Sequence, residues 1–296
     1  MKQDRPFTAV TVNKKGERAL RGGHPWVYGE ELTRTVPEGF ANGGLVDVLS
    51  EGGKYLGTGF FSAKSKIAVR VLSDNANERF GPEFWERRVG YALEYRRRVM
   101  GDAFGNCRLI FGESDGFPGL TVDRFGDYLS AEVLSFGMDL VKDAVFKALT
   151  DRIPGIKGIY LRCESHIRDL EGLPRISGWY EGFPHSGDGS TEIVENGIRY
   201  KVDFAAGQKT GFFLDQKFNR QAAGGLARGL RVLDVCTHTG SFALNALKCG
   251  AVSANALDVS ASALETAAAN MRLNPDIVKD TGGNDRMRLI KADAFE

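Results

Sequence analysis

An alternation of short apolar runs with amphipathic segments in the last third of the chain most constrains its fold. The pattern predicts strands at 231–235, 253–258 and 289–291, separated by helices at 241–247 and 261–273. Ser260 stands where the second helix needs an N-cap. Strands that alternate with helices in this order predict a parallel, doubly wound sheet, which binds its ligand at the carboxyl ends of the strands.

Aspartates stand at the ends of these three strands. Asp234 lies near the end of the first, Asp258 ends the second and Asp293 follows the third. Charged residues at the ends of buried strands are uncommon unless they serve a purpose. A carboxylate at Asp258 can accept hydrogen bonds from both ribose hydroxyls of an adenosine, and Asp293 is placed for an adenine amino group. The pattern therefore indicates a ligand that contains adenosine.

The turn after the first strand distinguishes two classes of such ligands. A dinucleotide site normally carries G-x-G-x-x-G here, so that a pyrophosphate can reach the amides of the following helix. This turn, residues 236–240, keeps only Gly240, and Asp234 would repel a phosphate. S-adenosylmethionine is a phosphate-free cation with an adenosine, and it fits this pattern better.

The first two thirds of the chain contain a different mixture of elements. Short strands predicted at 8–12, 45–49, 55–61 and 67–72 indicate a small β-barrel. A polar linker and a helix that starts at Pro82 follow. An α+β segment comes next, with strands at 107–111, 120–125, 128–133 and 158–163 and a helix at 138–149. Asn196-Gly197 between two β-type runs predicts a tight hairpin.

Composition excludes several classes of protein. Apolar residues make up 42% and charged residues 26% of the 296 residues, which is ordinary for globular proteins and excludes disordered or disulfide-scaffold chains. No apolar stretch approaches the ~20 residues of a membrane span, so we expect a cytoplasmic protein without a membrane partner. The four cysteines lie far apart and form no C-x-x-C pair, so we expect no metal site.

Charge is distributed unevenly along the chain. Residues 1–100 contain 17 Lys and Arg against 12 Asp and Glu, whereas the rest of the chain is acidic overall. A polyanionic partner and a solvated basic face explain this excess about equally well. The same two interpretations apply to Arg96, Arg97 and Arg98 on the predicted helix, and Trp26 is interpreted as a core residue rather than a platform for stacking bases.

Four segments of this sequence resemble motifs of one family, the large-subunit (23S) ribosomal RNA cytosine-5 methyltransferases, and they occur in the same order. They are GGHPWVY at 22–28, FGESDGFPGLTVD at 111–123, GQKTGFFLDQK at 207–217 and DVCTHTGSF at 234–242. The resemblance implies a multidomain α+β and α/β fold. Residues 1–74 would form a PUA-like RNA-binding barrel, residues 75–200 a linker helix and a central α+β domain, and residues 201–296 an incomplete Rossmann-like methyltransferase domain.

The resemblance also implies site residues and a chemistry. S-adenosylmethionine would be the cofactor, with RNA as the partner. In this family a cysteine thiolate attacks C6 of the target cytosine, so that C5 becomes a nucleophile toward the sulfonium methyl group. The cofactor-binding residues implied are Asp234, Thr237, Thr239 and Gly240 at the methionine end, Asp258 at the ribose, Asp293 at the adenine, and Lys209 and Phe213 near the same cleft.

One departure from the family pattern concerns catalysis. The family's aspartate-proline-proline motif and its later nucleophilic cysteine have no counterpart before Glu296, so we expect a C-terminally truncated chain whose catalytic residues are unknown. Cys236 is interpreted as a small residue packed beneath a ligand. A non-catalytic RNA-binding protein derived from a methyltransferase is the alternative, and a small-molecule methyltransferase is a third. Exposed edges of the half-built sheet would favour a homodimer or poor solubility.

Overall fold

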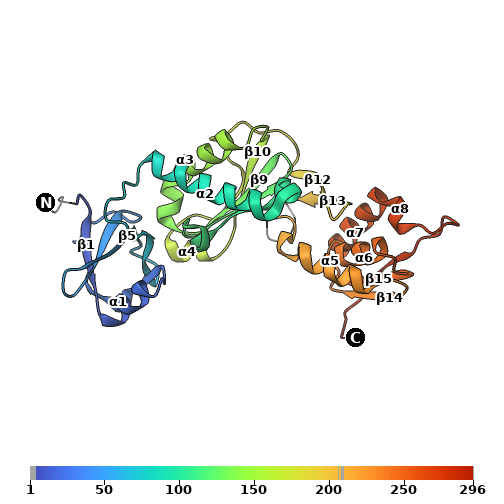
Figure 1. Ribbon diagram of the computed structural model, residues 1–296, viewed down its shortest axis with the longest axis horizontal. Coiled ribbons are helices and arrows are strands. Elements are labelled where there is room, and N and C mark those ends of the chain that lie inside the picture. Colours follow the sequence, from blue (N-terminus) through green and yellow to red (C-terminus); the bar gives the residue numbers. More distant parts are fainter. Residues whose placement is uncertain (1–4, 206, 208–209, 296) are drawn as a thin grey trace. The chain divides into compact units, whose positions relative to one another are not determined.

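The computed structural model describes residues 5–205, 207 and 210–295, and the chain divides into two compact units (Figure 1). The first unit comprises Met1–Phe104 and Arg108–Ser186, and the second comprises Gly105–Cys107 and Gly187–Glu296. No helix in the described parts of the chain is long and apolar enough to cross a membrane.

A six-stranded sheet opens the first unit. Its strands are β1 (Thr8–Val12), β2 (Trp26–Tyr28), β3 (Leu32–Arg34), β4 (Leu45–Ser50), β5 (Tyr55–Phe61) and β6 (Ile67–Ser73), in the order β2-β6-β5-β4-β1-β3. β1 is parallel to β4, and the other neighbours are antiparallel. Valines from four of the strands and Phe61 of a fifth meet in one core, so the sheet curls around it. Irregular registers between several strand pairs assist this curvature. The sequence predicted a small β-barrel from four strands, and the structure has a small β-domain of six, with β2 and β3 in addition.

A helix that the sequence analysis missed follows β1. α1 (Lys14–Arg21) starts at Asn13, whose side chain accepts a hydrogen bond from the Gly16 N–H at 3.0 Å. Gly16 lies inside the helix because a Cβ there would come within 3.1 Å of the Val12 side chain. Since α1 is short and largely polar, it has no apolar stripe from which its period could be read. A 3₁₀ turn, η1 (Gly29–Glu31), comes before β3.

A five-stranded sheet with helices forms the rest of the first unit. Its strands, in the order β11-β10-β9-β8-β7, are β7 (Asn106–Phe111), β8 (Leu120–Phe125), β9 (Tyr128–Val133), β10 (Gly158–Cys163) and β11 (Ile176–Trp179). The helical elements are α2 (Pro82–Met100), α3 (Phe136–Arg152), α4 (Ile167–Glu171), η2 (Gly101–Gly105) and η3 (Gly112–Asp115). α2 buries Trp85, Val89 and Leu93 and packs along α3.

Buried polar contacts join the two sheets of the first unit. Arg70 of β6 pairs with Glu171 at 2.9 Å and with Glu113 at 3.3 Å, and the Trp26 indole N–H donates to Glu113 at 2.8 Å. The Phe60 ring stacks on Trp85 of α2 with centroids 6.2 Å apart. The Arg70–Glu171 pair is buried on both sides and the contacts of Glu113 are partly buried, and the curled sheet and the α+β segment belong to one unit.

The second unit contains a hairpin and a parallel sheet. Its elements are β12 (Ser190–Glu195), β13 (Ile198–Asp203), η4 (Leu214–Gln216), α5 (Lys217–Leu226), β14 (Arg231–Val235), α6 (Ser241–Lys248), β15 (Ser253–Asp258), α7 (Ala261–Leu273), α8 (Pro275–Val278) and β16 (Met287–Lys291). Asn196 and Gly197 have φ of 53° and 70°, as the predicted hairpin turn requires. The hairpin, assigned from sequence to the middle segment, falls in the second unit.

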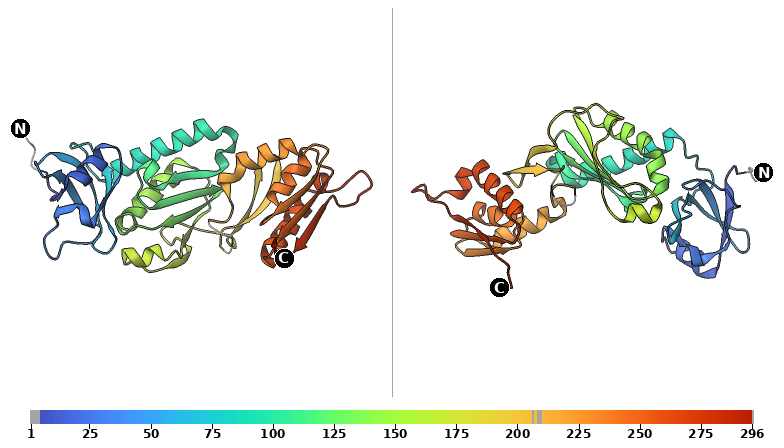
Figure 2. Two further views of the ribbon diagram at one scale, coloured as in Figure 1. Left: turned by 90° about the horizontal axis from the view of Figure 1, so that it is seen from below. Right: turned by 180° about the vertical axis from the view of Figure 1, so that it is seen from behind.

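The parallel sheet has the order β14-β15-β16, and a helical connection follows each of its first two strands. Two successive connections in the same direction place α6 and α7 on one face of the sheet, as Figure 2 shows. On the other face of β14, the Leu233 and Val235 side chains are exposed. Among the described strands, the sheet is thus wound in one direction only, whereas the sequence predicted a doubly wound sheet.

Candidate functional site

The turn between β14 and α6 has an unusual backbone. Cys236, His238 and Gly240 all have positive φ, of 58°, 52° and 75°. For residues with a side chain this left-handed conformation is unfavourable and is found where the surroundings impose it. Here the N–H of Thr237 donates to the Leu257 carbonyl at 2.9 Å, and the N–H of His238 donates to Asp258 Oδ2 at 2.8 Å. Two hydrogen bonds to β15 therefore hold the turn in place.

Asp234, in β14, stabilises the same turn through two hydrogen bonds. Its Oδ2 accepts a hydrogen bond from the Thr237 hydroxyl at 2.5 Å and another from the Ala243 N–H at 3.1 Å. The second bond satisfies an N–H in the first turn of α6, where a negative charge is also favourable. Burial raises the pKa of Asp234, and these hydrogen bonds oppose that rise. Asp234 thus shapes the turn rather than lining the cavity above it.

Asp258 is the carboxylate that reaches the cavity. Its Oδ1 accepts from the Ser260 N–H at 2.9 Å, and its Oδ2 accepts from the His238 N–H. Each oxygen is thereby oriented by one backbone donor. A carboxylate has about four acceptor positions, so capacity for further donors remains.

The cavity has a volume of about 440 Å³ and draws its walls from three parts of the second unit. The segment around η4 and the start of α5 forms one wall, and the β14–α6 turn forms another. The C-terminal end of β15 and the start of α7 form the third. Its lining residues are Phe212, Phe213, Gln216, Arg220, Cys236, Thr237, His238, Thr239, Ser241, Phe242, Asp258 and Ala263.

Aromatic rings form the wall opposite the turn. The Phe213 ring meets the His238 ring edge to face with centroids 5.1 Å apart, and the Phe212 ring lies 5.2 Å from that of Tyr200. Burial lowers the pKa of His238, and the nearby charge of Asp258 opposes this change. A neutral imidazole beside an aromatic ring adds to the apolar character of this wall.

The structure brings together some of the residues implied by the sequence and separates others. Phe213, Thr237, Thr239 and Asp258 line the cavity, and Asp234 and Gly240 belong to the turn and its support. Asp293 is exposed beyond β16, where it accepts the Phe295 N–H at 3.0 Å, and it does not line the cavity. Lys209 lies outside the described residues.

Sequence reasoning missed the residues that come from other elements. Phe212, Gln216, Arg220 and Ala263 line the cavity, although nothing in the local pattern marks them as neighbours of the turn. The resemblance to a family motif around residues 207–217 was the one signal that pointed to this wall. No group of three His, Cys, Asp or Glu side chains in the described ranges is placed to hold a metal ion.

The residues of the cavity fit a cationic, phosphate-free adenosine ligand. The Thr239 hydroxyl is buried and has no hydrogen-bond partner within the described structure, so it can serve a ligand. Asp258 offers acceptors, and the aromatic wall offers an apolar surface. Among the lining residues Arg220 is the one Arg or Lys, and it is paired with Glu195. The lining therefore suits hydroxyl and ammonium groups and offers no unpaired arginine or lysine to a phosphate.

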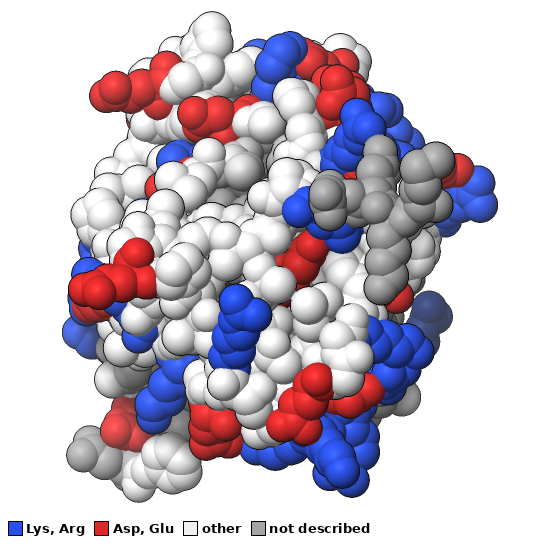
Figure 3. All heavy atoms as spheres, turned by 90° about the vertical axis from the view of Figure 1, so that its left-hand side faces the viewer, with Lys and Arg blue, Asp and Glu red and all other residues white. Residues whose placement is uncertain are grey.

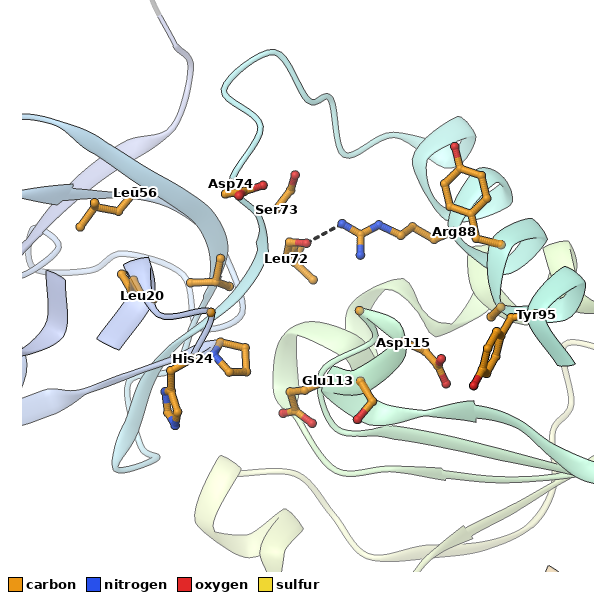
Figure 4. A pocket seen from close by; sticks show the side chains of 17 residues that line it. Leu20, His24, Leu56, Leu72, Ser73, Asp74, Arg88, Tyr95, Glu113 and Asp115 are labelled. Carbon is orange, nitrogen blue, oxygen red and sulfur yellow. Dashed lines mark hydrogen bonds between the residues drawn. The ribbon is translucent and has the colours of Figure 1, made fainter. Parts of the chain in front are cut away.

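A second cavity, of about 480 Å³, lies within the first unit between the curled sheet and α2 (Figure 4). Arg88 reaches across it and donates to the Leu72 carbonyl at 2.6 Å. Tyr91 and Tyr95, one helical turn apart on α2, line it, and the two residues are 62% and 57% exposed. Figure 3 shows basic and acidic side chains interspersed over the face that it views.

The three arginines in sequence on α2 all have partners in the structure. Arg96 pairs with Asp115 at 2.6 Å, Arg98 pairs with Glu94 at 2.5 Å, and Arg97 donates to the Arg152 carbonyl at 3.1 Å. These contacts favour a structural and solvated role over dedicated RNA contact. Trp26 is partly buried and held by Glu113, in line with a structural role.

Comparisons with known proteins match both units. A PUA-like domain model matches residues 10–74, and an S-adenosylmethionine-dependent methyltransferase model matches residues 175–284. The ribosomal RNA large subunit methyltransferase I of Photobacterium profundum is 37% identical over 290 residues, which are 98% of this chain and 71% of that protein. The protein of the same name from Shewanella denitrificans is 37% identical over 87% of this chain and 64% of its own length.

Solved structures share the fold. The structure described as "a putative sam-dependent methyltransferase from Streptococcus mutans" superposes with a TM-score of 0.79 at 21% identity and covers 98% of this chain and 72% of that one. Another, of "a putative methyltransferase complexed with SAH", has a TM-score of 0.80 at 21% identity, over 98% of this chain and 71% of that one. The chain spans about two thirds of the length of the curated relatives named above, and the expected truncation stays a prediction.

The sequence matches and the shared fold agree with the geometry of the cavity and with the PUA-like and methyltransferase architecture of the two units. S-adenosylmethionine is the cofactor of the methyltransferase domain whose model matches residues 175–284. The chain belongs to the ribosomal RNA large subunit methyltransferase I family.

Proposed function

We propose that the protein is an S-adenosylmethionine-dependent methyltransferase that acts on C5 of a cytosine in large-subunit ribosomal RNA, with the cavity at the β14–α6 turn as its cofactor site. No residue of this sequence is assigned to the attack on cytosine C6. The cavity supports the cofactor part of this proposal, and the resemblance of the four sequence motifs supports cytosine C5 as the target. The cavity combines an oriented carboxylate at Asp258, an unpartnered buried hydroxyl at Thr239 and an aromatic wall. The names of the curated relatives support large-subunit ribosomal RNA as the substrate.

In this proposal the residues of the chain bind and orient the cofactor. Asp258 would accept the ribose hydroxyls, and Thr239 would contact a polar group of the ligand. Phe212 and Phe213 would exclude water from one side. When bound, S-adenosylmethionine supplies an electrophilic methyl group on a sulfonium. Asp293 is exposed, so a role for it at the adenine rests on the family resemblance alone.

None of the four cysteines is proposed as the nucleophile that adds to cytosine C6. Cys107 and Cys163 are buried, and burial raises the pKa of Cys163, so neither offers a ready thiolate. Cys249 is half-buried at the end of α6. Cys236 is exposed, but its strained backbone belongs to the cofactor turn, where it forms part of the cavity wall.

Calorimetric titration with S-adenosylmethionine tests the cofactor site. We expect the wild-type chain to bind and Asp258→Ala to bind about 10- to 100-fold more weakly, because hydrogen bonds to a charged group are each worth about 1.5–3 kcal/mol. Asp276→Ala on α8, an exposed aspartate away from the cavity, is the matched control and should bind normally. Circular dichroism confirms that each variant is folded. No binding by the folded wild-type chain would overturn the proposal, and RNA affinity in that case would support the non-catalytic alternative.

We also propose that the RNA substrate contacts the second cavity, between the curled sheet and α2. Exposed aromatic rings stack on unpaired bases, and Tyr91 and Tyr95 present two such rings next to the PUA-like sheet. Replacing both by alanine should weaken binding of a single-stranded ribosomal RNA fragment about tenfold in fluorescence anisotropy, whereas replacing both by phenylalanine should have little effect. Equal affinities for the alanine and phenylalanine variants would exclude stacking here.

The homodimer expected from the sequence stays a prediction, which sedimentation equilibrium tests.

A further inference from the structure

Arg220, which lines the proposed cofactor cavity, belongs to a buried ion pair with Glu195. Arg220 of α5 lines the cavity, and its Nε donates to Oε1 of Glu195, the last residue of β12, at 2.7 Å. Both side chains are 1% exposed. Removing two charges from water is costly, and a well-packed apolar pair in such a place is often at least as stable. The pair therefore calls for an explanation other than stability.

Arg220 has a positioning role that an apolar residue could not fill. Its Nη2 donates to the Phe213 carbonyl at 2.9 Å, and its guanidinium carbon lies 4.6 Å from the centroid of the Phe212 ring. One side chain thus holds both residues of the aromatic wall. Since a planar guanidinium can make these contacts together, the position favours arginine.

A guanidinium in this wall creates an electrostatic difficulty for a cationic ligand. S-adenosylmethionine carries a positive sulfonium, and two like charges in a partly desolvated cavity repel one another much more strongly than in water. The product S-adenosylhomocysteine lacks both the methyl group and the sulfonium charge. An uncompensated Arg220 would therefore disfavour the substrate form of the cofactor relative to the product form.

Glu195 supplies the compensating charge at some cost to itself. Its Oε2 is buried and has no hydrogen-bond partner within the described structure. Burial raises the pKa of Glu195, and the positive charges of Arg220 and Lys217 oppose that rise. A carboxylate kept in such surroundings, with one oxygen left unsatisfied, contributes its charge more than its hydrogen bonds.

We propose that Glu195 is a specificity-determining residue: by neutralising Arg220 it allows the cavity to accept a cationic sulfonium, while Arg220 positions Phe212 and Phe213. The inference rests on the proposed cofactor site. It predicts an effect on the ratio of the affinities for S-adenosylmethionine and S-adenosylhomocysteine, which a merely structural ion pair would leave unchanged.

The experiment titrates both ligands calorimetrically into the full chain and its variants. Glu195→Gln keeps the size of the side chain and an acceptor for Arg220 but removes the charge. We expect it to lower the affinity for S-adenosylmethionine about tenfold more than the affinity for S-adenosylhomocysteine. Glu195→Met, which has no polar group to bury, takes its place if circular dichroism shows that the glutamine variant does not fold.

Two further variants complete the test. Glu195→Gln combined with Arg220→Gln removes both charges and should bring the affinity ratio back to that of the wild type, although both ligands bind more weakly without the contact to Phe213. Glu192→Gln is the matched control on the same strand, where the carboxylate pairs with Arg199 on the surface, and it should leave the ratio unchanged. Equal losses for the two ligands in Glu195→Gln overturn the inference alone, whereas a wild-type chain that binds neither ligand overturns the proposed function as well.

Discussion

Single residues in the β14–α6 turn determine the shape of the cofactor site. Cys236 and His238 adopt left-handed backbone conformations because neighbouring hydrogen bonds to β15 hold the turn. Both residues then line the same cavity as Asp258. Glycine would adopt this backbone more readily, so the presence of Cys and His shows that the strain is balanced by other contacts.

The ionisation of His238 should appear in the pH dependence of stability. Burial lowers the pKa of His238 in the folded chain below its usual value of 6.5. The unfolded chain then binds a proton more readily than the folded chain, so the free energy of unfolding falls as the pH drops through and below about 6.5. His238→Gln removes this contribution, and its stability should fall less than that of the wild type between pH 7.5 and pH 5.5. Urea denaturation at both pH values measures the free energy of unfolding of the two proteins. An equal fall for the wild type and His238→Gln would contradict the prediction.

Helix α7 connects the hairpin to the cofactor turn. Asn270 Oδ1 accepts the Lys201 N–H at 2.8 Å, and its Nδ2 donates to the Thr239 carbonyl at 2.9 Å. One turn later Asn274 makes two similar bonds to the backbone of Arg199, at 2.9 and 2.7 Å. Side-chain amides thus take the place of a neighbouring strand along β13.

Removing Asn270 should destabilise the second unit. Asn270→Ala leaves the buried Thr239 carbonyl and the partly buried Lys201 N–H without their partner, at a cost of up to about 1–3 kcal/mol for each. We expect a loss of about 2–4 kcal/mol in the free energy of unfolding by urea denaturation. Asn255→Ala on the exposed face of β15 is the control, with an expected change within about 0.5 kcal/mol. Similar values for the two variants would show that Asn270 has no docking role.

The division of the whole molecule into two units has a consequence for ligand binding. All residues that line the proposed cofactor cavity belong to the second unit, whereas the contacts among Arg70, Glu113 and Glu171 stabilise the first. A ligand stabilises the cooperative unit that binds it. The two units therefore need not respond alike to the cofactor.

Differential scanning calorimetry tests this expectation. At an S-adenosylmethionine concentration of about 100 times the dissociation constant, the ligand adds about 2.7 kcal/mol to the stability of the unit that binds it. We expect the unfolding transition of the second unit to move to higher temperature while that of the first unit stays in place. Asp258→Ala, which binds about 10- to 100-fold more weakly, should reduce this stabilisation to about 0.4–1.4 kcal/mol and the shift in proportion. A single transition that moves as a whole would show instead that the two units unfold together.

Local sequence patterns determined much of the fold of this protein. The strands at 231–235 and 253–258, the helix at 261–273 with its Ser260 cap, and the Asn196-Gly197 turn agree with the structure. Each of these elements is predicted either by the spacing of its apolar residues or by the residues of its turn or cap, all of which lie a few positions apart in the sequence. α1 escaped prediction because its stability comes from one cap and from packing against β1 and β2 rather than from an apolar stripe.

Tertiary structure alone decided how the cofactor cavity is closed. Asp258 and the β14–α6 turn could be placed from the strand order, because the carboxyl ends of parallel strands meet at one edge of a sheet. The opposite wall of Phe212, Phe213 and Arg220 comes from another segment, and Glu195 comes from a hairpin. Asp293 follows a strand as the pattern required, yet its side chain is exposed outside the cavity. Packing between distant segments, which no local period encodes, decides which polar side chains share one cavity.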